Sequence, residues 1–315
     1  MRIGIFVSET WGSASPIEQV RARAVRAEAL GYAVGWAPYL PWALDALTAI
    51  QAAGEATTRI ELGTAVIPTY FMHPLALARQ AATVQAAVGR PIHLGIGCSN
   101  EAVIGMHGLA YERPARHVRE YLEVLGPALA AGAAPSGERE QAGFVQFEGD
   151  FFRVGSIYGT PGAQSLGSIL VGALGPHMLR AAGAFADGTI ATWSNARAID
   201  RVIAPAIRSA AQAAGRPAPR IAGVLPVIVT RDVAAAREYA QQHFGIYESL
   251  PRYQRMLELG GARRASDVCL IGDEDSVADQ LRELEAAGMT DLLAAPLSFE
   301  ASTWEFTAER LAALV

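Results

Sequence analysis

The sequence predicts an α/β fold, specifically a (β/α)₈ TIM barrel with insertions, and three observations support this prediction. The 315 residues suit a single barrel domain over 1–315, because such barrels run to roughly 250 residues or more. Short apolar runs alternate with helix-like segments along the chain, as in parallel sheets. The runs number eight, which favours closure. An open doubly wound sheet is the alternative, but no GxGxxG turn follows the first run.

The first half of the chain contains four strand and helix pairs. The strands are expected at residues 3–8, 33–37, 60–66 and 92–97, and the helices at 15–30, 43–54, 74–88 and 115–131. The first helix carries the clearest signals, with Ser15 as N-cap, Pro16 at the first helical position and Gly31 as the stop.

A hairpin is predicted at about residues 143–154. The segment Phe144 to Val154 alternates apolar and polar residues around Glu148-Gly149-Asp150, which is typical of two antiparallel strands and a tight turn. We interpret it as an insertion into the barrel.

The alternation then resumes for four more units. Strands are expected at residues 168–173, 188–193, 221–230 and 290–296, with helices after 176, from about 196, from about 233, and over 275–287. The strands are almost continuously apolar, which indicates a parallel sheet covered on both faces.

Composition restricts the partners and the compartment. No apolar run is long enough to span a membrane and MRIGIFVSET carries no signal-peptide pattern, so we expect a cytoplasmic protein without a membrane partner. The net charge of −5 argues against nucleic acid and favours a small-molecule substrate. Cys98 and Cys269 are expected to be reduced thiols.

Several kinds of chemistry are disfavoured. The chain has no lysine, which removes Schiff-base catalysis and a P-loop lysine. The six histidines form no HxH or HExxH pair, so no metal site is expected, and no GxSxG motif marks an activated serine.

Functional residues of a barrel lie at the carboxyl ends of its strands, and three segments there are candidates. Leu62 to Pro74 is an irregular strand end, although an ordinary loop would look the same. In Leu94 to Ala102, two glycines allow a planar ligand to approach, or they only ease the rim of the barrel. In Ser168 to Gly188, a glycine-bearing turn and a helix start suit an anion such as a cofactor phosphate, although many such helices bind nothing. A mouth poor in acids and bases but rich in Trp, Tyr and Gly suits a cofactor with its own reactivity.

Together these segments resemble the bacterial luciferase-like barrel family, and within it the oxidoreductases that use the deazaflavin coenzyme F-420. The resemblance is carried by residues 2–6, 57–85, 93–100, 171–188 and 270–293. It implies a non-prolyl cis peptide at Ala65-Val66 that supports the ring. The implied cofactor-binding residues are Thr64, Ala65, Val66, Gly97, Cys98, Ser99, Gly172, Ala173, Leu174, Gly175, Pro176 and Met178.

At the strand ends we also expect a substrate pocket over the exposed face of the ring. Its expected residues are Trp11, Pro38, Tyr39, Trp42 and Trp193. Ser8, Glu9 and Asn100 are candidates for a catalytic, proton-handling role, although Glu9 could equally be a solvent-facing carboxylate. Arg113, Arg116 and Arg119 could attract an anionic cofactor tail, but solvated arginines are the commoner explanation.

A comparison within the family predicts that the substrate is not a sugar phosphate. The deazaflavin-dependent glucose-6-phosphate dehydrogenases use a His, a Glu and a Trp, and only Trp42 matches here. Pro38 and Asn100 stand in the other two places.

The predicted function is hydride transfer between coenzyme F-420 and an unidentified small organic substrate. One alternative is an FMN-dependent monooxygenase of the same fold, and another is a noncatalytic cofactor-binding barrel. A homodimer is a family-level expectation.

Overall fold

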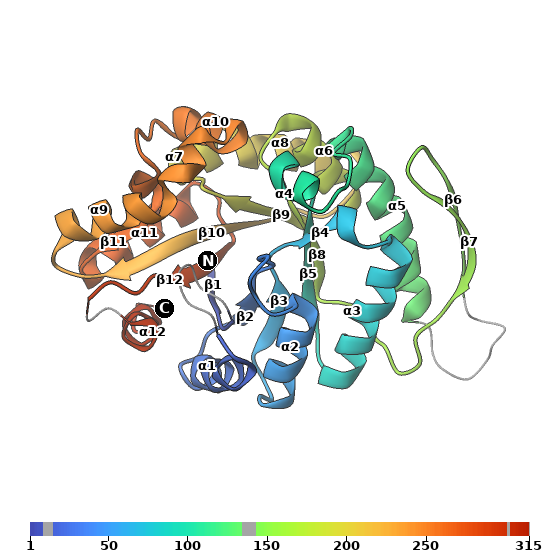
Figure 1. Ribbon diagram of the computed structural model, residues 1–315, viewed down its shortest axis with the longest axis horizontal. Coiled ribbons are helices and arrows are strands. Elements are labelled where there is room, and N and C mark those ends of the chain that lie inside the picture. The colour runs from blue at the N-terminus through green and yellow to red at the C-terminus, as the bar shows by residue number, and fades with distance from the viewer. Residues whose placement is uncertain (9–14, 134–142, 301–302, 315) are drawn as a thin grey trace.

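Eight parallel strands close into a barrel, as the sequence predicts. The structure is a computed structural model that describes residues 1–8, 15–133, 143–300 and 303–314. Around the barrel the strands are β1 (Arg2–Phe6), β2 (Val34–Ala37), β3 (Glu61–Thr64), β5 (Ile92–Gly97), β8 (Ser168–Gly172), β9 (Gly188–Thr192), β10 (Arg220–Val229) and β12 (Asp291–Pro296). β12 pairs with β1 and so completes the ring (Figure 1).

Two short strands add to this ring. β4 (Ile67–Pro68) continues from β3 and pairs with β5. β11 (Leu270–Gly272) pairs with the last residues of β10, at 227–229, while 222–227 of β10 pair with β12. β11 was not predicted, because a three-residue strand shows no periodicity.

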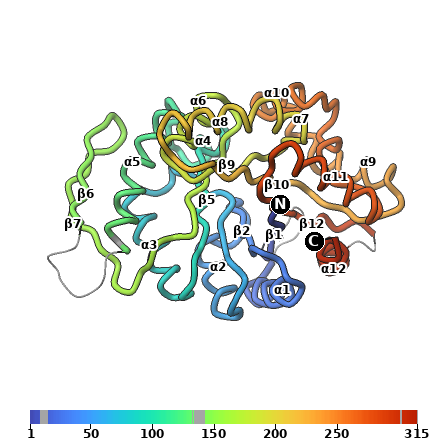
Figure 2. The backbone as a smooth tube through the Cα atoms, turned by 180° about the vertical axis from the view of Figure 1, so that it is seen from behind, coloured from blue at the N-terminus to red at the C-terminus, as the bar shows by residue number. Residues whose placement is uncertain are grey.

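Helices surround the barrel (Figures 1 and 2). They include α1 (Ile17–Ala29), α2 (Ala46–Glu55), α3 (Pro74–Val88), α4 (Glu101–Met106), α5 (Pro114–Gly132), α6 (Pro176–Phe185), α7 (Ala196–Ala198), α8 (Ala204–Ala213), α9 (Val233–Phe244), α10 (Pro251–Gly260), α11 (Glu274–Ala286) and α12 (Trp304–Ala312). α3 has the predicted bounds, whereas α4, α10 and α12 were not predicted. A π-helical turn (Ile199–Ile203) joins α7 to α8.

The predicted cap of the first helix is wrong. Pro16 occupies the N-cap position of α1, and no side chain caps the helix. The Ser15 hydroxyl donates instead to the Ser8 carbonyl, at 3.4 Å, and accepts from Arg23 Nη1, at 2.9 Å. Ser15 therefore joins α1 to the end of the first strand.

The predicted hairpin is present and lies on the outside of α5 (Figures 1 and 2). It consists of β6 (Gly143–Glu148) and β7 (Arg153–Tyr158), so it extends beyond the predicted end at Val154. Its inner face buries Val145 and Tyr158, and the Tyr158 hydroxyl donates to the Leu75 carbonyl at 3.0 Å.

The barrel interior is filled by its own apolar cluster. Phe6, Trp36, Leu170, Ile190 and Leu293 belong to this cluster. Trp36 takes the space that two strand glycines leave, since a β-carbon at Gly4 or Gly63 would lie 2.4 or 2.3 Å from its ring. The inside is therefore a packed core, and a ligand has to bind at one end.

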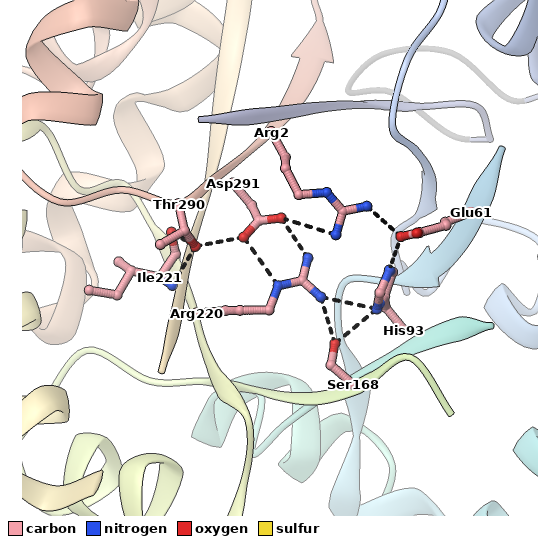
Figure 3. A network of polar contacts seen from close by, with 8 residues as sticks. All are labelled: Arg2, Glu61, His93, Ser168, Arg220, Ile221, Thr290 and Asp291. Carbon is pink, nitrogen blue, oxygen red and sulfur yellow. Dashed lines mark hydrogen bonds and ion pairs between the residues drawn. The ribbon is translucent and has the colours of Figure 1, made fainter. Parts of the chain in front are cut away.

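Polar side chains link the amino-terminal ends of the strands (Figure 3). They include Arg2, Glu61, His93, Ser168, Arg220 and Asp291. Arg220 is central: Nε and Nη2 donate to the two Asp291 carboxylate oxygens at 3.2 and 2.5 Å, and Nη1 lies 2.8 Å from Ser168 Oγ. The network joins strands from all sides of the barrel at this end.

Hydrogen bonding fixes the protonation of His93 in this network. Arg220 can only donate, so His93 Nδ1, 3.1 Å from its Nη1, is the acceptor. The ring proton is then on Nε2, which donates to Glu61 Oε2 at 2.6 Å. Burial lowers the pKa of His93, and the hydrogen bond from His93 lowers the pKa of Glu61 to about 2. His93 is therefore neutral and Glu61 ionised at neutral pH.

Candidate active site

Three predicted site segments meet at the carboxyl ends of the strands. The Ala65-Val66 peptide bond, between β3 and β4, is cis at the position that the resemblance implies. The Val66 side chain leans over two glycines, since a β-carbon at Gly97 or Gly172 would lie 2.9 or 3.4 Å from its Cγ2. Gly97 and Gly172 also pair in register. Val66 and the tips of β5 and β8 thus pack together and form one wall of the mouth.

Thr64 lies beneath this wall and is fully buried. Its hydroxyl donates to the Gly95 carbonyl at 3.1 Å and accepts from the Gly95 N–H at 3.0 Å. The side chain fastens β3 to β5 and leaves no surface for a ligand. Thr64 therefore supports the neighbouring Ala65 and does not itself contact a ligand.

The turn from β8 into α6 has the features of an anion site. Gly175 is exposed at the N-cap position, Pro176 follows it, and no side chain caps the helix. Nothing lies within 4 Å of the place a Gly175 β-carbon would take. Ala173 is buried, and its carbonyl accepts from Thr189 Oγ1 at 3.1 Å. The first N–H groups of α6, Met178 among them, are thus free of side-chain acceptors and suit a phosphate.

The polar residues at the tip of β5 form a compact cluster. Cys98 is 4% exposed, and its Sγ accepts from the Tyr111 hydroxyl and from Arg252 Nη1, both at 3.2 Å. Ser99 adopts a left-handed backbone conformation with φ 57°. Burial raises the pKa of Tyr111. Sequence reasoning missed Tyr111 and Arg252, since neither follows a strand.

The three proposed catalytic residues, Ser8, Glu9 and Asn100, differ in burial and in hydrogen bonding. Ser8 is 3% exposed, and its carbonyl accepts from Arg23 Nη1 at 3.1 Å. Glu9 lies outside the described residues. Asn100 caps α4, with Oδ1 accepting from the Val103 N–H at 3.0 Å. The amide nitrogen of Asn100 has no partner among the described residues and can still donate.

The predicted substrate pocket is only partly assembled. Trp11 lies outside the described residues, Pro38 and Tyr39 are half-buried, and Trp42 is 65% exposed. The Tyr39 ring lies 5.9 Å from that of Phe71, on the segment that follows the cis peptide. Trp193 is 1% exposed and therefore offers no surface to a substrate.

Trp193 belongs instead to a separate apolar cluster under α9 and α10. Its ring lies 4.8 Å from that of Phe244 and 4.6 Å from that of Tyr247. Successive side chains of a strand point to opposite faces, so a position at a strand end does not by itself bring a side chain into the mouth.

The arginines at the start of α5 are engaged in ion pairs. Arg113 and Arg116 contact Asp150 at 2.6 and 3.0 Å, in the turn of the hairpin. Arg119 contacts Glu123 at 3.2 Å. The two pairs with Asp150 fasten the hairpin to α5, whereas the Arg119 pair lies within the helix.

Two kinds of feature are absent from the described residues. No group of three or more His, Cys, Asp or Glu there could hold a metal ion. None of the helices in that part of the chain has the length and apolar character that a membrane crossing requires.

Comparison with known proteins relates the chain to one enzyme family. The model of the luciferase-like monooxygenases matches residues 1–291. An F-420-dependent glucose-6-phosphate dehydrogenase from Nakamurella multipartita is 27% identical over 273 residues, which are 81% of this chain and 75% of that protein.

Solved structures are similar over the whole chain. The coenzyme F-420-dependent tetrahydromethanopterin reductase from Methanopyrus kandleri has a TM-score of 0.76 and 22% identity, with 100% of this chain and 98% of that one covered. The oxygenating constituent of 3,6-diketocamphane monooxygenase from Pseudomonas putida, in complex with FMN, has a TM-score of 0.73 and 18% identity, with 99% and 96% covered. At these identities the likeness is one of fold.

Proposed function

The chain belongs to the luciferase-like monooxygenase family, and from this premise we propose that it is an oxidoreductase that uses coenzyme F-420. It transfers hydride between the deazaflavin and a small organic substrate. Relatives named for F-420 support the choice of coenzyme. The observation that supports the site most is the contact of Val66 with Gly97 and Gly172 beside the uncapped start of α6.

The residues at the mouth fit such a coenzyme. Ala65 and Val66 support one face of the ring, and Gly97 and Gly172 let the Val66 side chain pack closely on the tips of β5 and β8. The N–H groups at the start of α6 receive the phosphate. When bound, the deazaflavin supplies a hydride donor or acceptor at its C5 carbon. The protein contributes position, because holding two reactants in contact replaces a collision in solution.

The remaining groups act on the substrate side. Three rings, those of Tyr39, Phe71 and His107, form an aromatic belt. The Phe71 ring lies 5.9 Å from that of Tyr39 and 4.3 Å from that of His107. This belt restricts water at the reacting face. The free amide nitrogen of Asn100 donates a hydrogen bond to the substrate or the ring. Pro38 and Asn100 stand in place of an acid and a base, so we expect no turnover of glucose 6-phosphate.

Titration with purified cofactors tests the proposal. We expect oxidised F-420 to bind with a change in its fluorescence and FMN to bind at least about tenfold more weakly. In Gly97→Val the added side chain displaces Val66, which supports the ring, so binding is lost. Tight FMN binding without F-420 binding would replace the proposal with the monooxygenase alternative.

Turnover separates an enzyme from a carrier. Reduced F-420 is mixed with a panel of ketones, enones and imines, and oxidised F-420 with a panel of alcohols, while its absorbance is followed. Glucose 6-phosphate serves as the negative control. Binding without turnover in either direction would favour the noncatalytic barrel.

A further inference from the structure

The tip of β5 holds a backbone conformation that a serine does not favour. Ser99 has φ 57°, in the left-handed region, where a β-carbon crowds the neighbouring carbonyl. It lies between Cys98, which follows the buried strand β5, and Asn100, which caps α4. Such a conformation persists only where surrounding groups fix it.

Two side chains from other parts of the chain supply that restraint. The Ser99 carbonyl accepts from the Tyr111 hydroxyl at 3.2 Å and from Arg252 Nη1 at 3.4 Å. The same two donors reach Cys98 Sγ at 3.2 Å each. Arg252 Nη2 also donates to the Tyr111 hydroxyl. Both residues of the tip are therefore held by one connected pair of donors.

The pair also connects the two walls of the proposed ring site. The Tyr111 ring lies 5.4 Å from that of Tyr70, on the segment that leaves the cis peptide. The Tyr70 hydroxyl donates to the Glu112 carbonyl at 2.7 Å. A substitution at Tyr111 can therefore shift the segment after β3 as well as the tip of β5.

Arg252 is placed for this task by α10. In chain order this helix comes between β10 and β11. The guanidinium carbon of Arg252 lies 5.4 Å from the centre of the Tyr111 ring. None of the ion pairs among the described residues includes Arg252. Its contacts are a thiol, a phenol and a backbone carbonyl, so its hydrogen bonds orient neutral groups.

We propose that Arg252 and Tyr111 are positioning residues for cofactor binding, which hold Ser99 left-handed and Cys98 in register so that the tip of β5 matches the ring edge. The proposal rests on the proposed function for the identity of the ring. The arrangement of the tip itself can be measured without any cofactor.

Removal of either donor should weaken binding. Arg252→Met keeps the stem and removes the guanidinium, and Tyr111→Phe removes only the hydroxyl. We expect each to raise the Kd for oxidised F-420 about tenfold, as the loss of a hydrogen bond to a charged or buried group does. Because the two donors act as a unit, the double variant should lose less than the product of the two single losses.

A second substitution distinguishes positioning from attraction of an anion. Glycine adopts the left-handed region at little cost, so Arg252→Met should raise the Kd several-fold less in a Ser99→Gly chain than in the wild type. Attraction of an anion would give the same loss in both chains, and the loss would shrink at high salt. That pair of results would overturn the proposal.

Thiol labelling reports on the tip in the absence of cofactor. Cys98 and Cys269 are both buried, so both should react slowly with iodoacetamide in the folded wild-type protein. Arg252→Met and Tyr111→Phe should speed the alkylation of Cys98, located by peptide mass spectrometry, while Cys269 serves as the internal control. Unchanged labelling would refute the clamp. Faster labelling in a protein that binds no F-420 would refute the proposed function alone.

Discussion

At the scale of single residues, the two glycines near the end of β5 have different partners. A β-carbon at Gly95 would lie 2.1 Å from the Thr64 carbonyl oxygen, which is backbone and cannot turn away. A β-carbon at Gly97 would come closest to the end of the Val66 side chain, at 2.9 Å. A side chain at Gly95 would therefore push backbone aside, whereas one at Gly97 would displace Val66.

Gly95→Ala should destabilise the protein by about 3 kcal/mol, since strands β3 and β5 have to move apart. Chemical denaturation measures this change. The matched control is Gly105→Ala in α4, where nothing lies within 4 Å and alanine favours the helix by up to about 1 kcal/mol. Equal stability of the two variants would contradict the packing argument.

His117 makes the protein sensitive to acid. It is 6% exposed and stacks on Tyr70 with the ring centroids 4.0 Å apart, and burial lowers its pKa to about 4. The unfolded chain takes up a proton near pH 6.5 that the folded chain takes up only near 4. Stability is therefore fully present above pH 6.5 and falls as the pH drops toward 4.

We expect His117→Phe to flatten this fall. Denaturant unfolding at several pH values between 7 and 4 gives the slope, which should decrease by up to about one proton. His243→Gln, which removes an exposed histidine of α9, serves as the control and should keep the wild-type slope. An unchanged slope in His117→Phe would assign the acid sensitivity to other groups.

At the scale of elements, the polar network fastens strand ends both between neighbours and across them: Arg220 of β10 contacts Asp291 on its neighbour β12 and Ser168 on β8, which is not its neighbour. Arg220→Met leaves the Asp291 side chain, which is 4% exposed, without its two hydrogen bonds from β10. A buried charge that loses its partner destabilises a protein by about 3 kcal/mol. Urea denaturation should show this loss, while F-420 affinity, which depends on the other end of the strands, should be unchanged.

Arg282→Met is the matched control for that variant. It breaks an ion pair with Asp279 whose side chains are 72% and 63% exposed, so the loss should stay below about 1 kcal/mol. Similar losses in both variants would show that burial of Asp291 contributes nothing.

The sequence predicted the elements whose signals are local. Pro74 and the glycine after Val88 mark both ends of α3, and the alternation around Gly149 marks the hairpin. β11 was not predicted, because its three residues form a strand only by pairing with the last three residues of β10. α10 lies in a segment that a barrel does not require, so no repeat of the pattern pointed to it.

The candidate site was predictable where backbone defines it. The rule that sites lie at strand ends selected Val66, Gly97 and Gly172, which the structure brings into contact. The rule failed for Trp193, because a strand end does not say which way a side chain points. It could not find Arg252, which reaches the tip of β5 from 154 residues further along the chain.

At the scale of the whole molecule, a bound cofactor should stabilise the fold. A ligand at about 100 times its Kd adds about 2.7 kcal/mol, which raises the Tm of a chain of this size by roughly 5 °C. A thermal shift with F-420 but not with FMN is the expected result. Gly97→Val should melt at the same temperature with and without F-420, and a shift there would place the coenzyme elsewhere.

The two sides of the mouth come from separate stretches of the chain. The proposed ring wall comprises residues 64–68, 97–99 and 172–178, whereas the groups proposed to face the substrate include 38–42. Changes in the loop after the second strand can therefore alter the substrate side without touching the proposed coenzyme platform. A library confined to 38–42 would explore new substrates without rebuilding the chemistry.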